Sequence, residues 1–125
     1  MKIAILGAGN LGLSIGRGLI TNNSLTQLYL TRRSVESIAS WTEYANTYVT
    51  ADNKKAVNES DIIILAGQPR QLVGLLEEIK DLLHDNHVLI STVTGFSLAK
   101  MEETLGTDVF VIRSMPNTAI SVGKS

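Results

Sequence analysis

Three glycines follow the first apolar segment at a spacing that suits phosphate binding. The segment at residues 2–6 runs directly into the sequence GAGNLG, which has the G-x-G-x-x-G pattern. In such a loop the first glycine permits a tight turn, the second lets the backbone approach a pyrophosphate, and the third lets a helix pack on a sheet. The N-terminus of that helix adds N–H donors and a partial positive charge. Because the pattern stands between an apolar strand and a helical stretch, it predicts a dinucleotide-binding loop. The loop consists of Gly7, Ala8, Gly9, Asn10, Leu11 and Gly12.

The alternative is that these glycines serve only a tight turn. Gly16 and Gly18 continue the series and indicate close packing of the helix that follows.

Basic residues stand where the second apolar segment ends. A site that prefers NAD usually carries an acidic residue about 20 positions beyond the glycines, bonded to the ribose 2′-hydroxyl. Here no acidic residue precedes Glu36, and the segment instead ends in Thr31, Arg32, Arg33 and Ser34. Guanidinium groups and hydroxyls can bind a 2′-phosphate, so the sequence predicts that NADP(H) is preferred over NAD(H). The alternatives are that one arginine is a solvated loop charge, or that Glu36 turns back to the ribose.

Short apolar runs alternate with helical patterns along the chain. The runs are continuous, as is typical of parallel strands that are covered on both faces. They lie at residues 3–6, 28–30, 62–66, 88–90 and 109–112, with a weaker strand at 47–50. Helical spacing occurs at residues 72–83 after Pro69, at 98–105 between a Ser97 cap and Gly106, and at 35–42 after a Ser34 cap. The alternation predicts a Rossmann-type, doubly wound parallel α/β sheet of about six strands, with helices on both faces.

The composition predicts a single domain, residues 1–125. Hydrophobic residues make up 44% of the chain and charged residues 18%, which excludes intrinsic disorder. The net charge of -1 predicts no nucleic-acid partner, and the lack of an apolar stretch of about 18 residues predicts no membrane span. The chain has no cysteine, which excludes disulfides and fits a cytoplasmic protein.

No metal site is predicted. His84 and His87 stand near Asp81 and Asp85, and a solvated loop is the favoured interpretation of this group. Trp41, Tyr44 and Tyr48 are interpreted as packing residues rather than as a platform for nucleic-acid bases.

Several segments resemble the N-terminal part of pyrroline-5-carboxylate reductases, and together they extend over the whole chain. They are residues 7–12, 50–53, 65–69, 91–95, the narrower segment RSMPNT at 113–118, and Val122-Gly123. The resemblance implies hydride transfer from NAD(P)H to the imine 1-pyrroline-5-carboxylate, which gives proline. Departures from the family pattern are Gln68 where the family usually has lysine, Ala119 where it commonly has proline, and Ser125 where it often has glycine.

The resemblance also implies roles for individual segments. Asn53 would lie beside the adenosine of the cofactor. The ribose and phosphates would be lined by Ala66, Gly67, Gln68 and Pro69. The nicotinamide would be approached by Thr92, Val93, Thr94 and Gly95. The loop beside the nicotinamide and the substrate would be formed by Met115, Pro116, Asn117 and Thr118; the alternative for this loop is a structural turn. No general acid, and hence no catalytic residue, is identified.

In the family, a helical C-terminal domain completes the substrate pocket and forms the dimer. The chain is therefore expected to be the cofactor domain without that second domain, and to be inactive or nearly so alone. A homodimer or higher oligomer is expected only for the longer enzyme, with a small imine as substrate. Two alternatives stay open: a non-catalytic dinucleotide-binding or regulatory module, and a related imine or 3-hydroxyacid reductase.

Overall fold

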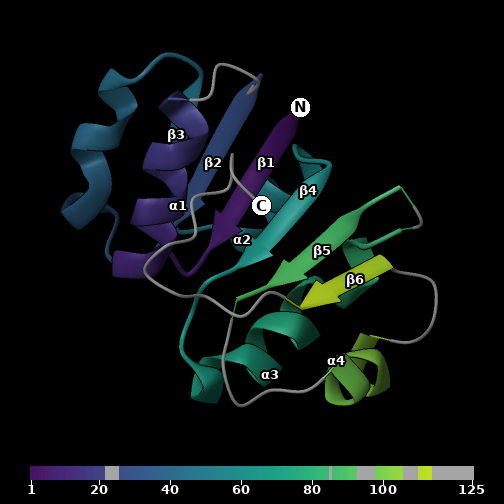
Figure 1. The fold of residues 1–125 in the computed structure, drawn as a ribbon. Coiled ribbons are helices and arrows are strands. Elements are labelled where there is room, and N and C mark those ends of the chain that lie inside the picture. Colours follow the sequence, from purple (N-terminus) through teal and green to yellow (C-terminus); the bar gives the residue numbers. More distant parts are fainter. Residues whose placement is uncertain (22–25, 85, 93–97, 106–109, 114–125) are drawn as a thin grey trace.

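The chain forms one parallel β-sheet. The computed structural model describes residues 1–125 except 22–25, 85, 93–97, 106–109 and 114–125. Six strands lie side by side in the order β3-β2-β1-β4-β5-β6, and every pair is parallel (Figure 1). The strands are β1 (Lys2–Leu6), β2 (Gln27–Thr31), β3 (Thr47–Thr50), β4 (Ile62–Leu65), β5 (Val88–Ser91) and β6 (Phe110–Arg113). In this sheet β2 and β3 are added on one side of β1 and β4, β5 and β6 on the other, so the strand order reverses between β1 and β4. Open α/β sheets bind ligands at such a point.

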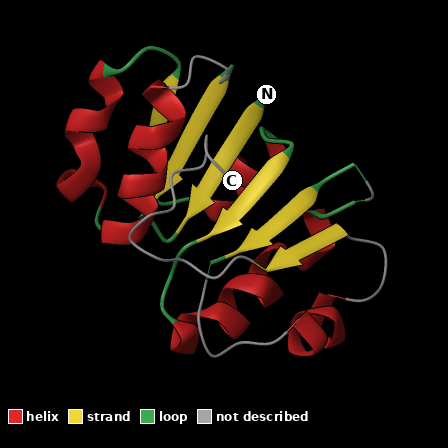
Figure 2. Cartoon of the chain, viewed as in Figure 1, coloured by secondary structure: helices red, strands yellow, loops and turns green. Residues whose placement is uncertain are grey.

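Helices cover both faces of the sheet, as Figure 2 shows. They are α1 (Asn10–Thr21), the 3₁₀-helix η1 (Val35–Glu43), α2 (Asn53–Asn58), α3 (Pro69–Ile79), the short 3₁₀-helix η2 (Lys80–Leu82) and α4 (Leu98–Leu105). The predicted doubly wound sheet of about six strands is confirmed. Among the described residues, no helix has the length and apolar character that a membrane crossing requires.

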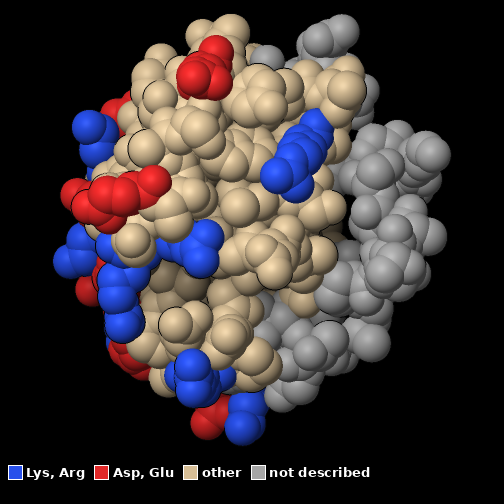
Figure 3. All heavy atoms as spheres, turned by 90° about the vertical axis from the view of Figure 1, so that its left-hand side faces the viewer, with Lys and Arg blue, Asp and Glu red and all other residues tan. Residues whose placement is uncertain are grey.

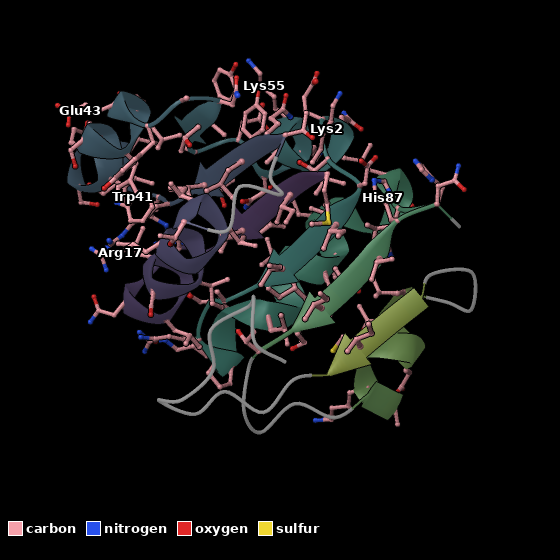
Figure 4. All side chains as sticks on the ribbon, turned by 45° about the horizontal axis from the view of Figure 1, so that its top comes forward. Lys2, Arg17, Trp41, Glu43, Lys55 and His87 are labelled. Carbon is pink, nitrogen blue, oxygen red and sulfur yellow. The ribbon has the colours of Figure 1, made fainter. Side chains whose placement is uncertain are left out.

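The first face of the sheet is covered by α1 and η1. Ile15 of α1 and Ile38 of η1 are buried against the β1 side chain of Ile5 and its neighbours. A Cβ atom added to Gly16 would lie 3.3 Å from the Trp41 ring, so the missing side chain lets η1 approach α1. The guanidinium carbon of Arg17 lies 5.4 Å from the centre of the same ring (Figure 4). Trp41 is therefore a packing residue, as predicted.

The second face is covered by α2, α3 and α4. The buried side chains of α3 are Leu72, Leu76 and Ile79, spaced so that they share one side of the helix. They form one cluster with Leu65 of β4 and Met101 of α4. The α-helix ends at Ile79, earlier than the predicted pattern at 72–83, and continues as η2. The leucines of the last predicted turn, Leu82 and Leu83, still pack against the cluster.

The segment at 35–43 differs from its prediction. It forms a 3₁₀-helix, in which the buried residues Ile38 and Trp41 are three positions apart, while the predicted core residue Thr42 is exposed. Two hydroxyls donate to carbonyls three residues earlier, from Ser37 to Ser34 at 2.7 Å and from Thr42 to Ala39 at 2.9 Å. Such bonds compete with α-helical ones and favour the tighter turn. Ser34 occupies the N-cap position as predicted, but its side chain makes no capping hydrogen bond.

Candidate functional site

The loop between β1 and α1 forms a tight turn. Gly7 adopts a φ of 73°, the left-handed region that favours glycine. The N–H of Ala8 donates to the carbonyl of Thr31 at 2.8 Å, and the N–H of Gly9 donates to that of Gly7 at 2.8 Å. A Cβ atom at Gly7 would lie 3.0 Å from the Cα of Gly67, so the loops after β1 and β4 approach each other closely. Position 7 therefore requires glycine.

Gly9 and Gly12 differ in what surrounds them. A Cβ atom at Gly12 would lie 3.1 Å from Cγ2 of Ile5 and 3.2 Å from Cβ of Ala66, so α1 packs closely on the sheet there. A Cβ atom at Gly9 would meet nothing within 4 Å. The described residues therefore place no packing demand on Gly9 and leave the space beside its backbone open. Asn10 and Leu11 are exposed in the first turn of α1, whose N–H groups have no intrahelical acceptor.

A pocket of about 610 Å³ opens at the carboxyl ends of the strands. Its wall includes Gly7 after β1, Arg32 and Arg33 after β2, Asn53 after β3 and Gly67 after β4. Its other wall is formed by residues of α3, from Arg70 near the start of the helix to Glu78 in its last turn. The volume lies in the range of small-molecule sites. The structure thus brings together residues that are separated by more than sixty positions in the chain.

Hydrogen bonds tie three of these strand ends together. The Thr31 hydroxyl accepts from the N–H of Gly7 at 3.1 Å and donates to Oδ1 of Asn53. Asn53 opens α2, and the preceding Asp52 caps that helix by accepting from the N–H groups of Lys54 and Lys55. Because the Thr31 hydroxyl is buried and donates its proton to Asn53, it positions the loops. The arginines beside it are better placed to meet a phosphate.

Arg32 and Arg33 extend from the end of β2. The N–H of Arg32 donates to the carbonyl of Thr50 at 3.2 Å, which fixes its backbone, and both side chains line the pocket. In the part of the chain that the structure describes, neither arginine forms an ion pair. Glu36 is exposed and accepts a hydrogen bond from the Ser34 hydroxyl at 3.2 Å; neither residue lines the pocket. Figure 3 shows the face of the molecule that lies on the left in Figure 1, where basic side chains are mixed with acidic ones.

The loop after β4 leads directly into α3. The N–H of Ala66 donates to the carbonyl of Leu6 at 3.0 Å, and Gly67 lines the pocket. Pro69 is in the first turn of α3, as predicted, and the N–H of Gln68 donates to Oε1 of Gln71 at 3.2 Å. Gln68 and Pro69 are exposed and lie outside the pocket wall.

The loop after β5 is described only at its start. Thr92 is buried, and its hydroxyl donates to the carbonyl of Leu65 at 2.8 Å. The other residues of the predicted nicotinamide segment (93–95) and the whole predicted substrate loop (115–118) lie outside the described residues. Their roles stay predictions.

The sequence reading missed the contribution of α3. Arg70, Gly74, Leu75 and Glu78 all line the pocket. Pro69 at the start of the helix was the available signal. It places Arg70 at the second helical position, five residues after the end of β4. Residues 70, 74 and 78 then follow at intervals of four and share one face of the helix.

The two histidines do not form the solvated group that the sequence suggested. His84 is exposed, but His87 is buried, and the two rings stack with centres 3.9 Å apart. The Nδ1 atom of His87 accepts from the N–H of His84 at 3.1 Å, and its Nε2 lies 3.1 Å from the carbonyl of Ser60. These partners hold a neutral ring with the proton on Nε2. No cluster of residues suited to metal binding occurs among the described positions.

The stability of the fold is expected to fall as the pH decreases below about 6.5, the usual pKa of histidine. Burial lowers the pKa of His87 in the folded chain, and the neighbouring His84 lowers it further. The unfolded chain therefore takes up a proton at His87 at a pH where the folded chain does not, which favours unfolding. The free energy of unfolding should be measured with denaturant on both sides of pH 6.5.

The matched variants are His87→Gln and His84→Gln. His87→Gln should be less stable at high pH, because it loses the stacked ring, and should lose less stability on acidification. His84→Gln should keep most of the acid-dependent loss. An equal loss in the wild type and in His87→Gln would contradict the assignment.

Known proteins resemble this chain in sequence and in fold. The family model described as NADP oxidoreductase, coenzyme F420-dependent, matches residues 2–95. Pyrroline-5-carboxylate reductase 2 of Dictyostelium discoideum is 40% identical over 128 residues, which cover 99% of this chain and 43% of that protein.

Solved structures agree with this match. A pyrroline-5-carboxylate reductase of Coxiella burnetii has a TM-score of 0.86 and 31% identity, covering 94% of this chain and 44% of that one. A pyrroline carboxylate reductase of Plasmodium falciparum, solved with NADP bound, has a TM-score of 0.79 and 24% identity, with coverage of 94% and 42%. The chain thus spans less than half the length of these relatives. It belongs to the family described as NADP oxidoreductase, coenzyme F420-dependent, and it is similar to the N-terminal, NAD(P)-binding part of pyrroline-5-carboxylate reductases.

Proposed function

We propose that the chain binds NADPH in preference to NADH. The observation that carries this proposal is the pair of arginines, Arg32 and Arg33, on the pocket wall at the end of β2. No acidic residue precedes Glu36 in the chain, and Glu36 lies outside that wall. A carboxylate at this position would repel a 2′-phosphate, whereas a guanidinium can form paired hydrogen bonds with it.

The remaining residues fit the other parts of the cofactor. The open space beside Gly9 and the N–H groups at the start of α1 suit the pyrophosphate. The pocket between Asn53 and α3 suits the adenosine. NADPH, when bound, supplies the hydride and both of its electrons. The described residues bind and orient it at the carboxyl edge of the sheet, with the arginines holding its phosphorylated end.

The hydride acceptor that we propose is a cyclic imine, 1-pyrroline-5-carboxylate, which would be reduced to proline. The 40% identity to the Dictyostelium enzyme over 99% of this chain supports this substrate. Since the chain spans 43% of that relative, the proposal assigns cofactor binding to the described residues and substrate binding to a longer protein. We also place that protein in the cytoplasm as a homodimer or higher oligomer.

The test of this reaction is a chimaera in which the chain is joined to the C-terminal part of the Dictyostelium relative. We expect it to oxidise NADPH when 1-pyrroline-5-carboxylate is added and to form proline. A chimaera that binds NADPH, folds as a dimer and forms no proline would favour the alternative of a non-catalytic binding module.

Cofactor preference is tested by titrating the chain with NADPH and with NADH. One charge-assisted hydrogen bond to the 2′-phosphate contributes about 1.5–3 kcal/mol, so NADPH should bind roughly 10- to 150-fold more tightly. Arg32→Gln and Arg33→Gln should each reduce NADPH affinity and leave NADH affinity nearly unchanged. The larger effect identifies the arginine that contacts the phosphate.

The matched control is Arg17→Gln. This arginine lies in the same acid-free segment. It projects from α1 over the Trp41 ring of η1 and does not line the pocket. Its replacement should leave both affinities unchanged. Equal binding of NADPH and NADH by the wild type, unaltered in Arg32→Gln and Arg33→Gln, would overturn the proposed preference.

A further inference from the structure

Residues along most of the length of helix α3 line the pocket. Six of its residues line the cavity, opposite the two arginines that follow β2: Arg70, Gln71, Leu72, Gly74, Leu75 and Glu78. The sequence pattern that marks dinucleotide sites does not include this helix, because the pattern covers only the glycine loop and the end of the second strand. That pattern therefore gives no role to the individual residues of α3.

Arg70 adds a third positive charge to the pocket. It lies at the second position of α3, while Arg32 and Arg33 come from the end of β2, so cations enter the pocket from two elements. None of the three forms an ion pair within the described part of the chain. The lining also includes one carboxylate, that of Glu78, so three cations and one anion give it a net positive charge. Cations gathered around one cavity repel each other unless an anion lies between them. The arrangement suits a phosphate dianion more closely than a ribose hydroxyl.

Gly74 leaves a gap in the middle of the same wall. It is exposed in the interior of α3, where glycine weakens a helix relative to alanine. A Cβ atom at this position would meet no described atom within 4 Å, so none of the described neighbours requires glycine here. The position lines the pocket one turn after Arg70 and one turn before Glu78. A flat ring can therefore lie directly against the helix backbone.

We propose that α3 binds the phosphorylated adenosine of the cofactor, with Arg70 contacting the 2′-phosphate opposite Arg32 and Arg33, and with Gly74 leaving the space for the adenine ring. This inference rests on the proposed binding of NADPH and extends it to a second specificity element. Arg70 recognises the phosphate that distinguishes NADPH from NADH. Gly74 serves any adenosine ligand, whether or not it carries that phosphate.

The first experiment separates the two roles with small probes. Adenosine 2′,5′-bisphosphate and adenosine 5′-monophosphate are titrated into the wild type and into Arg70→Gln, with Arg17→Gln as the matched control. We expect Arg70→Gln to weaken binding of the bisphosphate by about 10- to 150-fold, as for one lost charge-assisted bond. Binding of the monophosphate should change little. Equal bisphosphate affinities in Arg70→Gln and Arg17→Gln would overturn the role of Arg70.

The second experiment fills the gap at Gly74. Gly74→Leu places a bulky side chain in the pocket and a strong helix former in the helix, so the melting temperature should be unchanged or higher. Both probes should bind at least about 10-fold more weakly, because the leucine side chain occupies the space of the adenine ring. Val73→Leu is the matched control, because Val73 is exposed on the same helix but does not line the pocket. Unchanged binding in a stable Gly74→Leu protein would overturn the role of Gly74.

The outcomes also distinguish this inference from the proposed function. If Arg32→Gln weakens binding of the bisphosphate and the α3 variants do not, the proposed NADPH binding stands and the proposed roles of Arg70 and Gly74 are refuted. If the wild type binds neither probe and does not bind NADPH, the proposed function fails, and the proposed role of α3 in adenosine binding fails with it.

Discussion

Gly7→Ala is expected to destabilise the fold by about 2–5 kcal/mol and to weaken NADPH binding strongly. The estimate combines about 1–2 kcal/mol for a side chain in the left-handed region with about 1–3 kcal/mol for overpacking. Both costs arise here, because Gly7 has a φ of 73° and its added Cβ would lie 3.0 Å from Cα and 3.1 Å from N of Gly67. The contact is with backbone, which cannot rotate away. Relief requires the loops after β1 and β4 to separate, and both line the pocket.

The measurement is denaturant unfolding of the wild type, Gly7→Ala and Gly9→Ala. Gly9 is two residues away in the same loop, has no positive φ, and offers open space to a Cβ atom. Gly9→Ala should therefore unfold within about 0.5 kcal/mol of the wild type, as surface substitutions usually do. Similar losses of stability in both variants would show that the close approach of Gly67 does not limit position 7.

The fold was predictable because its signals are local and repeated. Each strand is a short, continuous apolar run, and the burial of Ile3 to Leu6 in β1 shows why: neighbours cover both faces. The 3₁₀-helix η1 escaped prediction because its apolar spacing was read as α-helical through Thr42, whereas Trp41 is the buried residue. The burial of Trp41 requires space beside Gly16 of α1, which has no side chain and so leaves room for the indole ring.

The site was predictable only where its residues are neighbours in sequence. Gly7, Gly9 and Gly12 form one loop, and Arg32 follows a recognisable strand end. Arg70 could not be paired with Arg32 from spacing, because the pocket exists only after β4 lies beside β1 in the sheet.

His87 shows the same limit. Its ring is buried and lies 3.1 Å from the carbonyl of Ser60, which is 27 positions away in the chain.

Gly9→Val is expected to abolish dinucleotide binding without loss of stability. No described residue lies within 4 Å of a Cβ atom at this position, so the described part of the fold tolerates the side chain. The proposed pyrophosphate occupies that same open space, next to the N–H groups at the start of α1. A valine there holds the phosphates away from these donors. Two lost charge-assisted bonds of about 1.5–3 kcal/mol each correspond to an affinity at least about 100-fold lower.

The measurement is titration with NADPH and NADH, paired with denaturant unfolding of the same samples. Gly9→Val should weaken both cofactors equally, because the pyrophosphate is common to them, whereas Arg32→Gln should weaken NADPH alone. Gly9→Ala should fall between the wild type and Gly9→Val, since its side chain fills less of the space. Gly7→Ala differs from all three by losing stability as well. If a stable Gly9→Val protein binds NADPH as tightly as the wild type, the pyrophosphate does not pass beside Gly9, and the assignment of the glycine loop as its binding site is wrong.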